Sequence, residues 1–164
     1  MLLFLLACAA KAPEDSAAPE VFIAMQADFA GFLDWEALPV STADTGHVDG
    51  ERTVYIQRRP PAGAAAFPVG TMIVKTIAWS GGLDVHAMAK RGGGFNPEGV
   101  GWEWFELTLL PDGTPVMLWR GAGPPDGEGY QNQADDSAVD TVSGDCNTCH
   151  AAAAENDFVF TVGL

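Results

Sequence analysis

The residues with the clearest chemical meaning lie near the end of the chain, where the sequence reads Cys-Asn-Thr-Cys-His from Cys146 to His150. Two thiols separated by two residues and followed at once by a histidine form the attachment motif of c-type haem. The cysteines can bond the two vinyl groups of one porphyrin as thioethers, and the histidine can bind the iron as its proximal ligand. The spacing therefore predicts one covalently bound haem c, held by Cys146, Cys149 and His150.

Two other interpretations of the cysteine pair stay open at this point. A redox-active dithiol would use both thiols but would not require the adjacent histidine. A zinc site would need a second pair of ligands, and the sequence contains no second pair of this kind. The third cysteine, Cys8, lies in a different part of the chain.

The first residues predict export from the cytoplasm. An apolar run from Leu2 to Ala7 is too short to span a bilayer, and its end, Leu-Leu-Ala-Cys8, resembles a bacterial lipobox. On that interpretation residues 1–7 are a signal segment, residues 8–20 a lipoprotein-like tether and residues 21–164 the haem domain. An ordinary secretory leader is the alternative. Both place the protein outside the cytoplasm, either periplasmic or anchored to the membrane through a lipid on Cys8.

The composition narrows the class of partner. The chain of 164 residues has a formal net charge of −14, which would repel the phosphates of nucleic acid and the head groups of anionic lipid. The charge suits a basic redox partner such as another cytochrome, because complementary potentials speed encounter, although solubility alone is the simpler explanation. Without the leader and tether, about 145 residues remain, enough for one domain with one core.

The elements that would position the motif are mostly strands. Apolar residues at offsets of three and four predict an amphipathic helix over Val21–Leu38, ended by Pro39. Runs rich in β-branched and aromatic residues, separated by glycine and proline clusters, then predict strands. The expected strands are Arg52–Gln57, Thr71–Trp79, Asp84–Lys90, Trp102–Leu110 and Pro115–Arg120.

The connections between these runs predict the fold class. Pro111-Asp112-Gly113 is typical of a hairpin turn. The polar, glycine-rich stretch Gly121–Gly144 predicts a long surface loop, and Ala151–Ala154 predicts a helical turn. Short strands joined by short turns favour a single α+β domain, predominantly an antiparallel sheet with a few helices.

The side of the iron opposite His150 would decide the chemistry. Alternation along Thr71–Trp79 places Lys75 on one face with Ile73 and Ile77. Lys75 is either an edge-strand lysine whose stem reaches water, or a desolvated amine that has lost its charge and become reactive. Arg52 begins another strand, and it is either a surface charge or a partner for a haem propionate.

The strand Asp84–Lys90 carries further candidates. Its alternate residues, beginning with Asp84 and His86, form one face with the polar character of a solvent-exposed surface. His86 could nevertheless face the iron, whereas His47 lies in a polar, turn-rich segment. The candidate sulfur ligands are Met72, Met88 and Met117, and packing is the simpler explanation for each.

Several segments make the chain resemble the cytochrome P-460 family, which includes the cytochromes c′-beta. The resemblance covers roughly residues 35–164, and the haem motif at its end is shared with many other cytochromes. The segments that carry it, in this order, are RTVYI (Arg52–Ile56), GTMIVK (Gly70–Lys75), MAK (Met88–Lys90), FNPEGVGWEWF (Phe95–Phe105), CNTCH (Cys146–His150) and DFVF (Asp157–Phe160).

The resemblance implies a mainly antiparallel β fold, a homodimer, and a single haem c with His150 proximal and the opposite iron position open. Enzymes of the family oxidise hydroxylamine, with nitric oxide or nitrous oxide as products. In those enzymes a lysine is cross-linked to the porphyrin, and it corresponds to Lys75. The arginine of RTVY corresponds to Arg52. Electrons would leave through the haem to an external cytochrome.

The chain departs from the hydroxylamine oxidisers at one position. Those enzymes place a carboxylate near the open iron position as proton acceptor, and the matching residue here is His86, with Asp84 two residues away on the same face. Histidine can accept protons near neutral pH, so His86 or Asp84 could serve. The c′-beta members instead bind nitric oxide or carbon monoxide in an apolar pocket, for which Phe29 and Phe32 are candidate caps or simply core residues.

The sequence therefore leaves three functions open. The first is a hydroxylamine-oxidising enzyme in which Lys75, His86 and Asp84 are the catalytic candidates. The second is a nitric oxide-binding protein without catalysis. The third is a simple electron carrier whose iron has a second protein ligand.

Overall fold

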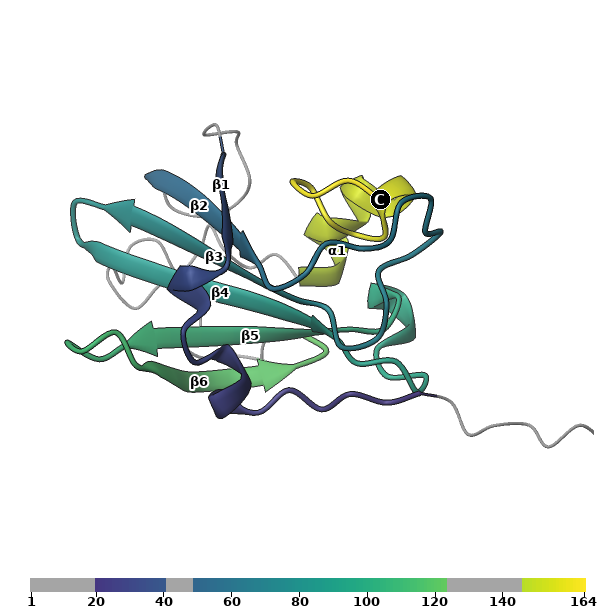
Figure 1. The fold of residues 1–164 in the computed structure, drawn as a ribbon, viewed down its shortest axis with the longest axis horizontal. Coiled ribbons are helices and arrows are strands. Elements are labelled where there is room, and N and C mark those ends of the chain that lie inside the picture. The colour runs from purple at the N-terminus through teal and green to yellow at the C-terminus, as the bar shows by residue number, and fades with distance from the viewer. Residues whose placement is uncertain (1–19, 41–48, 124–145) are drawn as a thin grey trace, which may run out of the picture.

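The computed structural model describes residues 20–40, 49–123 and 146–164, which form an antiparallel sheet with short helices packed against it (Figure 1). The order of the strands in the sheet is their order in the chain. The described residues thus have the expected predominantly antiparallel β architecture with a few short helices. The strands are β1 (Glu36–Val40), β2 (Glu51–Ile56), β3 (Met72–Trp79), β4 (Gly82–Lys90), β5 (Trp102–Leu109) and β6 (Pro115–Gly121).

The helices of the described residues are all short. One is an α-helix, α1 (Cys146–His150), and the others are 3-10 helices: η1 (Gln26–Phe29), η2 (Phe32–Asp34), η3 (Pro97–Gly99) and η4 (Ala151–Asn156). Within the described ranges, none is long and apolar enough to cross a bilayer. Cys8, His47 and nearly all of the predicted loop Gly121–Gly144 lie outside the described residues.

Five of the six strands agree with the sequence prediction to within two residues at each end. The predicted hairpin turn between β5 and β6 is confirmed, since Leu110 N donates to Thr114 O at 2.9 Å. The predicted helical turn Ala151–Ala154 is confirmed as part of η4. Local β propensity and turn chemistry were therefore sufficient for most of the sheet.

The predicted amphipathic helix over Val21–Leu38 is wrong, because the chain there forms η1, η2 and then β1. Gly31 separates the two 3-10 helices with a φ of 71°, a conformation that glycine adopts readily and that ends a continuous helix. Phe29 ends η1 and Phe32 begins η2, so the spacing of three between them does not belong to one helix. Pro39 lies within β1, an edge strand, where its missing N–H is tolerated.

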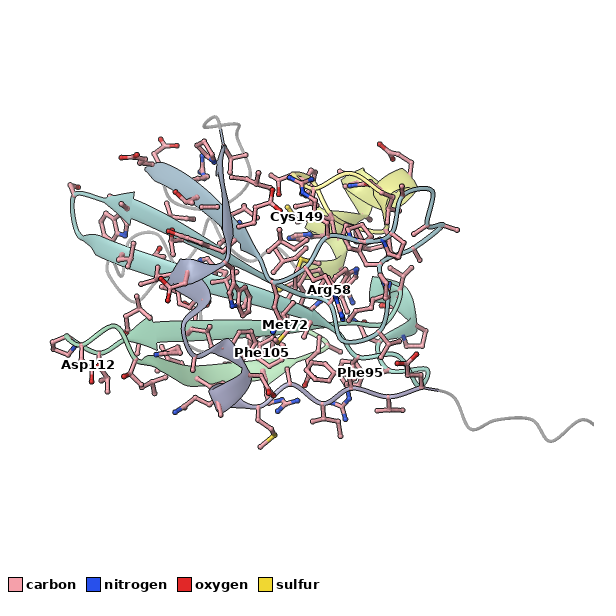
Figure 2. All side chains as sticks on the ribbon, in the orientation of Figure 1. Arg58, Met72, Phe95, Phe105, Asp112 and Cys149 are labelled. Atoms are coloured by element: carbon pink, nitrogen blue, oxygen red, sulfur yellow. The ribbon has the colours of Figure 1, made fainter. Side chains whose placement is uncertain are left out.

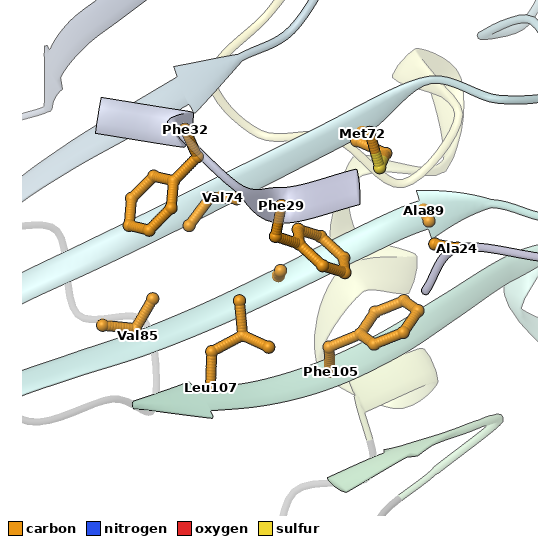
Figure 3. Close-up of a cluster of buried hydrophobic side chains, with 10 residues drawn as sticks. Ala24, Phe29, Phe32, Met72, Val74, Val85, Ala89, Phe105 and Leu107 are labelled. Carbon is orange, nitrogen blue, oxygen red and sulfur yellow. The ribbon is translucent and has the colours of Figure 1, made fainter. Parts of the chain in front are cut away.

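One face of the sheet is covered by the N-terminal segment. Phe29 and Phe32 are 0% and 1% exposed, and they lie over Val74 and Leu107 (Figure 3). The ring of Phe29 meets Phe105 edge-on, with centroids 5.1 Å apart. Each buried phenylalanine contributes about 1.5–3 kcal/mol by its removal from water. Phe29 and Phe32 are therefore core residues that attach this segment to the sheet.

The opposite face is covered by α1 and the segment that follows it. Ile73 and Met88 from the strands form a second core with Phe158 and Val162 from the C-terminal segment. The motif helix lies toward one end of the sheet, and Asp112 in the β5–β6 turn lies at the other (Figure 2). Strand alternation assigns Met72 and Val74 to the first core and Ile73 to the second, so Lys75 belongs to the face that carries the motif.

Candidate functional site

The Cys-Asn-Thr-Cys-His motif forms α1 itself. Residues three positions apart share a helix face, so the sulfurs of Cys146 and Cys149 lie on the same side of this helix. Both cysteines are partly buried thiols, and Cys146 packs against the core that contains Ile73 and Trp104. Cys146 therefore lies beside apolar side chains of the sheet, as a residue bonded to a porphyrin would.

Asn147, the first of the two residues between the cysteines, fixes α1 to the loop between β4 and β5. Its side chain is buried, its Oδ1 accepts from Asn96 Nδ2 at 2.9 Å and Trp104 Nε1 at 2.8 Å, and its Nδ2 donates to Asn96 Oδ1 at 2.8 Å. Asn96 Nδ2 also donates to the carbonyl of Trp102 at 2.7 Å. A Cβ atom at Gly99 would collide with both amides, so this loop requires glycine there.

His150 has the ring orientation expected of a metal ligand. Its Nδ1 lies 2.7 Å from the carbonyl oxygen of Phe158, and because a carbonyl only accepts, Nδ1 must be the donor. In the neutral ring the lone pair is then on Nε2. The ring lies 4.5 Å from Trp104 and 5.3 Å from Phe160, measured between centroids.

The surroundings of His150 favour the neutral ring. Burial lowers the pKa of His150 to about 4, and the charges of Lys75 and His86 lower it as well, against the hydrogen bond to Phe158, which raises it. At neutral pH the imidazole is therefore uncharged and has one nitrogen able to bind a metal. Lys75 and His86 are therefore close enough to His150 for their charges to affect its pKa.

A continuous row of side chains crosses the motif-bearing face of the sheet. Residues directly opposite each other in antiparallel strands have their side chains on the same face. Lys75 in β3 is opposite His86 in β4, and His86 is opposite Glu106 in β5. The row continues to Val54 in β2 and Trp119 in β6.

Lys75 is not an edge-strand lysine, because β3 lies between β2 and β4. Burial, followed by the positive charge of Arg52, lowers the pKa of Lys75 from 10.5 to about 8, although Cys149 and Cys146 act in the opposite direction. Arg52 is itself 4% exposed, so its interpretation as a surface charge is wrong. Two desolvated cationic side chains thus lie within electrostatic reach of each other, and Lys75 within reach of both motif thiols.

His86 pairs with a carboxylate that the sequence interpretation missed. Its Nδ1 lies 3.2 Å from Glu106 Oε2, and the two side chains are 24% and 17% exposed. A recognisable signal was present, since alternation along β5 places Glu106 on the same face as Trp102 and Trp104. Asp84, the acid considered from the sequence, accepts a hydrogen bond from Trp79 Nε1 at 3.2 Å.

The expected solvent exposure of the Asp84–Lys90 face is wrong for most of its length. Met88 and Lys90 are 6% and 7% exposed, and the carboxylate of Asp157 holds the Lys90 ammonium at 2.7 Å. The residues that cover this face come from the C-terminal segment, far away in sequence. The alternation of polar and apolar residues within one strand cannot show which distant residues will pack over it.

The three candidate methionines differ in position. Met72 is buried under the N-terminal segment, and Met117 packs against the same core. Met88 belongs to the core on the face that carries α1. Of the three, Met88 is thus the one placed on the same face as the motif.

The motif residues have the donor chemistry that the protein side of a haem c site requires. Among residues 20–40, 49–123 and 146–164, no group of three or more His, Cys, Asp and Glu side chains could hold a metal ion. Haem iron needs only an axial protein ligand, because the porphyrin supplies the other donors. His150 can be that ligand, Cys146 and Cys149 the attachment points, and Arg52 a partner for a propionate. No protein-family model, curated protein or solved structure matches the chain.

Proposed function

We propose that this protein is an exported mono-haem c-type cytochrome, related to the cytochrome P-460 family, that oxidises hydroxylamine at an open iron position. Cys146 and Cys149 would hold the porphyrin, and His150 would be the proximal ligand. The observation that carries the proposal is the gathering of Lys75 and His86 around these three residues on one face of the sheet.

A bound haem c would supply an iron that takes small nitrogen ligands and passes their electrons to an external redox partner. The neighbouring side chains would handle the protons, because the oxidation of hydroxylamine releases protons together with electrons. Histidine is a common proton acceptor in enzymes, and His86 Nδ1 lies 3.2 Å from Glu106 Oε2, a carboxylate that would stabilise an imidazolium there. A group of this kind contributes about 10²–10⁴-fold to a rate.

Lys75 would have a second role in the proposed enzyme. A lysine linked to a porphyrin uses its neutral amine, and the pKa of about 8 leaves a minority of Lys75 neutral at physiological pH, more than an ordinary lysine would have. This supports Lys75 as the lysine that becomes cross-linked to the porphyrin. A capture protein for nitric oxide is the second candidate, but the polar row Lys75–His86–Glu106 favours proton chemistry over an apolar gas pocket.

The proposal extends to the location and assembly of the protein. Export would bring the chain to the compartment in which bacteria attach c-type haem, with a lipid on Cys8 as a membrane anchor. The net charge of −14 suits a basic cytochrome as the electron acceptor. A homodimer is proposed on the resemblance to the family.

The test is expression of the full chain in a periplasm competent for haem c maturation, followed by spectroscopy and assay. We expect a green protein with a strongly red-shifted ferrous band that reduces an external acceptor when hydroxylamine is added. In a tryptic digest, cleavage after Lys75 should be lost while cleavage after Lys90 is retained. The variant Lys75→Ala should restore an ordinary c-type spectrum.

Other outcomes would contradict the enzymatic proposal. A red protein whose ferrous spectrum shifts with nitric oxide but which does not oxidise hydroxylamine would support the gas-binding function. A spectrum that is indifferent to small ligands would support an electron carrier, and Met88→Leu would then open the iron if Met88 were its second ligand.

A further inference from the structure

The carbonyl group that orients His150 belongs to a segment of unusual backbone geometry. Asp157 and Phe158 have φ values of 52° and 69°, in the left-handed region that side chains other than glycine seldom adopt. Aspartate tolerates this region better than most residues, whereas phenylalanine does not. This turn brings the Phe158 carbonyl back to His150, eight residues earlier, at 2.7 Å. An outside restraint must hold such a conformation.

One restraint on this turn is a buried ion pair, which acts together with the hydrogen bonds of Asp157 N and Phe158 N to the carbonyls of Ala154 and Ala153. Lys90 Nζ donates to Asp157 Oδ1 at 2.7 Å and Oδ2 at 2.8 Å, and the two side chains are only 9% and 8% exposed. Phe67 N also donates to Oδ2 at 2.8 Å. The Asp157 carbonyl accepts from Trp102 Nε1 at 2.7 Å. The backbone of Asp157 is thereby tied to the end of β4, to the start of β5 and to the loop before β3.

A buried ion pair is weak evidence for stability, since well-packed apolar side chains often do as well, but such pairs can specify one geometry. Lys90 has two further contacts that keep its ammonium in place: it donates to the Val100 carbonyl at 2.6 Å and lies 5.0 Å from the Trp102 ring centroid. The Lys90 ammonium, which binds the Asp157 carboxylate, is thus held in place by the sheet. The ion pair thereby helps to position the Phe158 carbonyl, one residue later.

We infer that Lys90 and Asp157 are positioning residues for the proximal ligand: the ion pair holds the Asp157–Phe158 turn so that the Phe158 carbonyl keeps the proton on His150 Nδ1. This fixes the tautomer whose Nε2 can bind iron, and it increases the electron donation of the ring to the metal. The inference rests on the proposed function for its relevance to iron, but the tautomer of His150 is a property of the chain alone.

The test variant is Asp157→Asn in the full chain. Asparagine keeps the size, the tolerance for the left-handed region and an oxygen for Phe67 N, and it removes the charge and one of the two acceptor oxygens that hold Lys90. In the parent protein at neutral pH, ring ¹⁵N NMR should show His150 as a single neutral tautomer protonated at Nδ1. In Asp157→Asn the ratio of the Nδ1–H to the Nε2–H tautomer should fall about tenfold.

Two further variants keep the test decisive. The double variant Lys90→Met with Asp157→Asn buries no unpaired charge, so it provides a folded protein if the single variant is unstable, and it should show the same mixture of tautomers. Asp112→Asn makes the same chemical change in the exposed β5–β6 turn and should leave His150 as in the parent.

In protein that has matured with haem, the same variants should lower the iron–histidine stretching frequency, because the ring loses a hydrogen bond that strengthens it as a donor. A single Nδ1–H tautomer and an unchanged frequency in the folded Asp157 variants would overturn the inference, as would an equal effect of Asp112→Asn. If no haem is retained, the proposed function fails, whereas the NMR result still decides whether the ion pair positions His150.

Discussion

His86 and Glu106 face each other across β4 and β5, with Nδ1 of the histidine 3.2 Å from Oε2 of the carboxylate. Both side chains are partly covered, so solvent and salt screen their interaction less than on an open surface. A carboxylate in this position orients an imidazole and stabilises its protonated form. This pair is the proposed proton acceptor on the face of the sheet that carries α1.

Replacement of Glu106 by glutamine should remove the stabilisation of a protonated His86 while preserving the size of the side chain. We expect kcat for hydroxylamine oxidation to fall by about 100-fold or more, with the haem content and the absorption spectrum of the resting protein unchanged. Steady-state kinetics with a soluble electron acceptor would measure the effect.

The matched control is Glu98→Gln, which removes an exposed carboxylate in η3 and should leave kcat at the parent value. Equal rates for Glu106→Gln and the parent protein would exclude the His86–Glu106 pair from the rate-limiting proton transfer.

Replacement of Lys75 by methionine should stabilise the haem-free chain at neutral pH. The pKa of Lys75 is about 8 in the folded protein and 10.5 as its ordinary value, so between these values the unfolded chain binds more protons and the stability of the parent rises with pH. The increase in the free energy of unfolding caused by Lys75→Met should therefore be largest below pH 8, up to about 3 kcal/mol. It should vanish as the pH approaches 10.5. Urea unfolding at several pH values would measure it.

The same substitution at Lys90 should change the free energy of unfolding in the opposite direction. Lys90→Met would leave the Asp157 carboxylate buried without its cation, which should cost about 3–5 kcal/mol. If both lysine variants changed the free energy of unfolding in the same direction at pH 7, the burial assigned to Lys75 would be wrong.

Replacement of Asn147 by alanine should loosen α1 from the sheet. The change would leave the buried side chains of Asn96 and Trp104 without the partner they share, at a cost of about 3 kcal/mol. Glu155→Ala, at an exposed position in the adjoining helix η4, should change stability by no more than about 0.5 kcal/mol. Equal urea midpoints for the two variants would contradict the docking role of Asn147.

Much of the sheet could be predicted from the sequence because its strands are marked locally. β-branched and aromatic runs set the strands, and turns such as Pro111–Gly113 set their connections. The N-terminal segment could not be predicted in this way, because its apolar spacing fits one amphipathic helix, whereas Gly31 divides the segment into η1 and η2. The strands that Phe29 and Phe32 pack against lie far away in sequence and leave no mark on that spacing.

For the candidate site, the sequence is informative where a charged residue shares a strand face with apolar residues. Lys75 stands out in this way among isoleucines, and Glu106 stands out in the same way among tryptophans. The partners of Asn147 and Asp157 could not be found, because Asn96 and Lys90 lie far away in sequence. Their contacts depend on how the C-terminal segment folds back over the sheet.

Covalent attachment of haem can be read from the mass of the peptide that contains Cys146–His150, taken from protein matured in a periplasm competent for haem c attachment and extracted with acidified acetone. We expect the haem to stay on this peptide through both cysteines, and the double variant Cys146→Ser with Cys149→Ser to retain none. A parent peptide that carries two unmodified thiols, or a disulfide between them, would rule out a haem c in this protein.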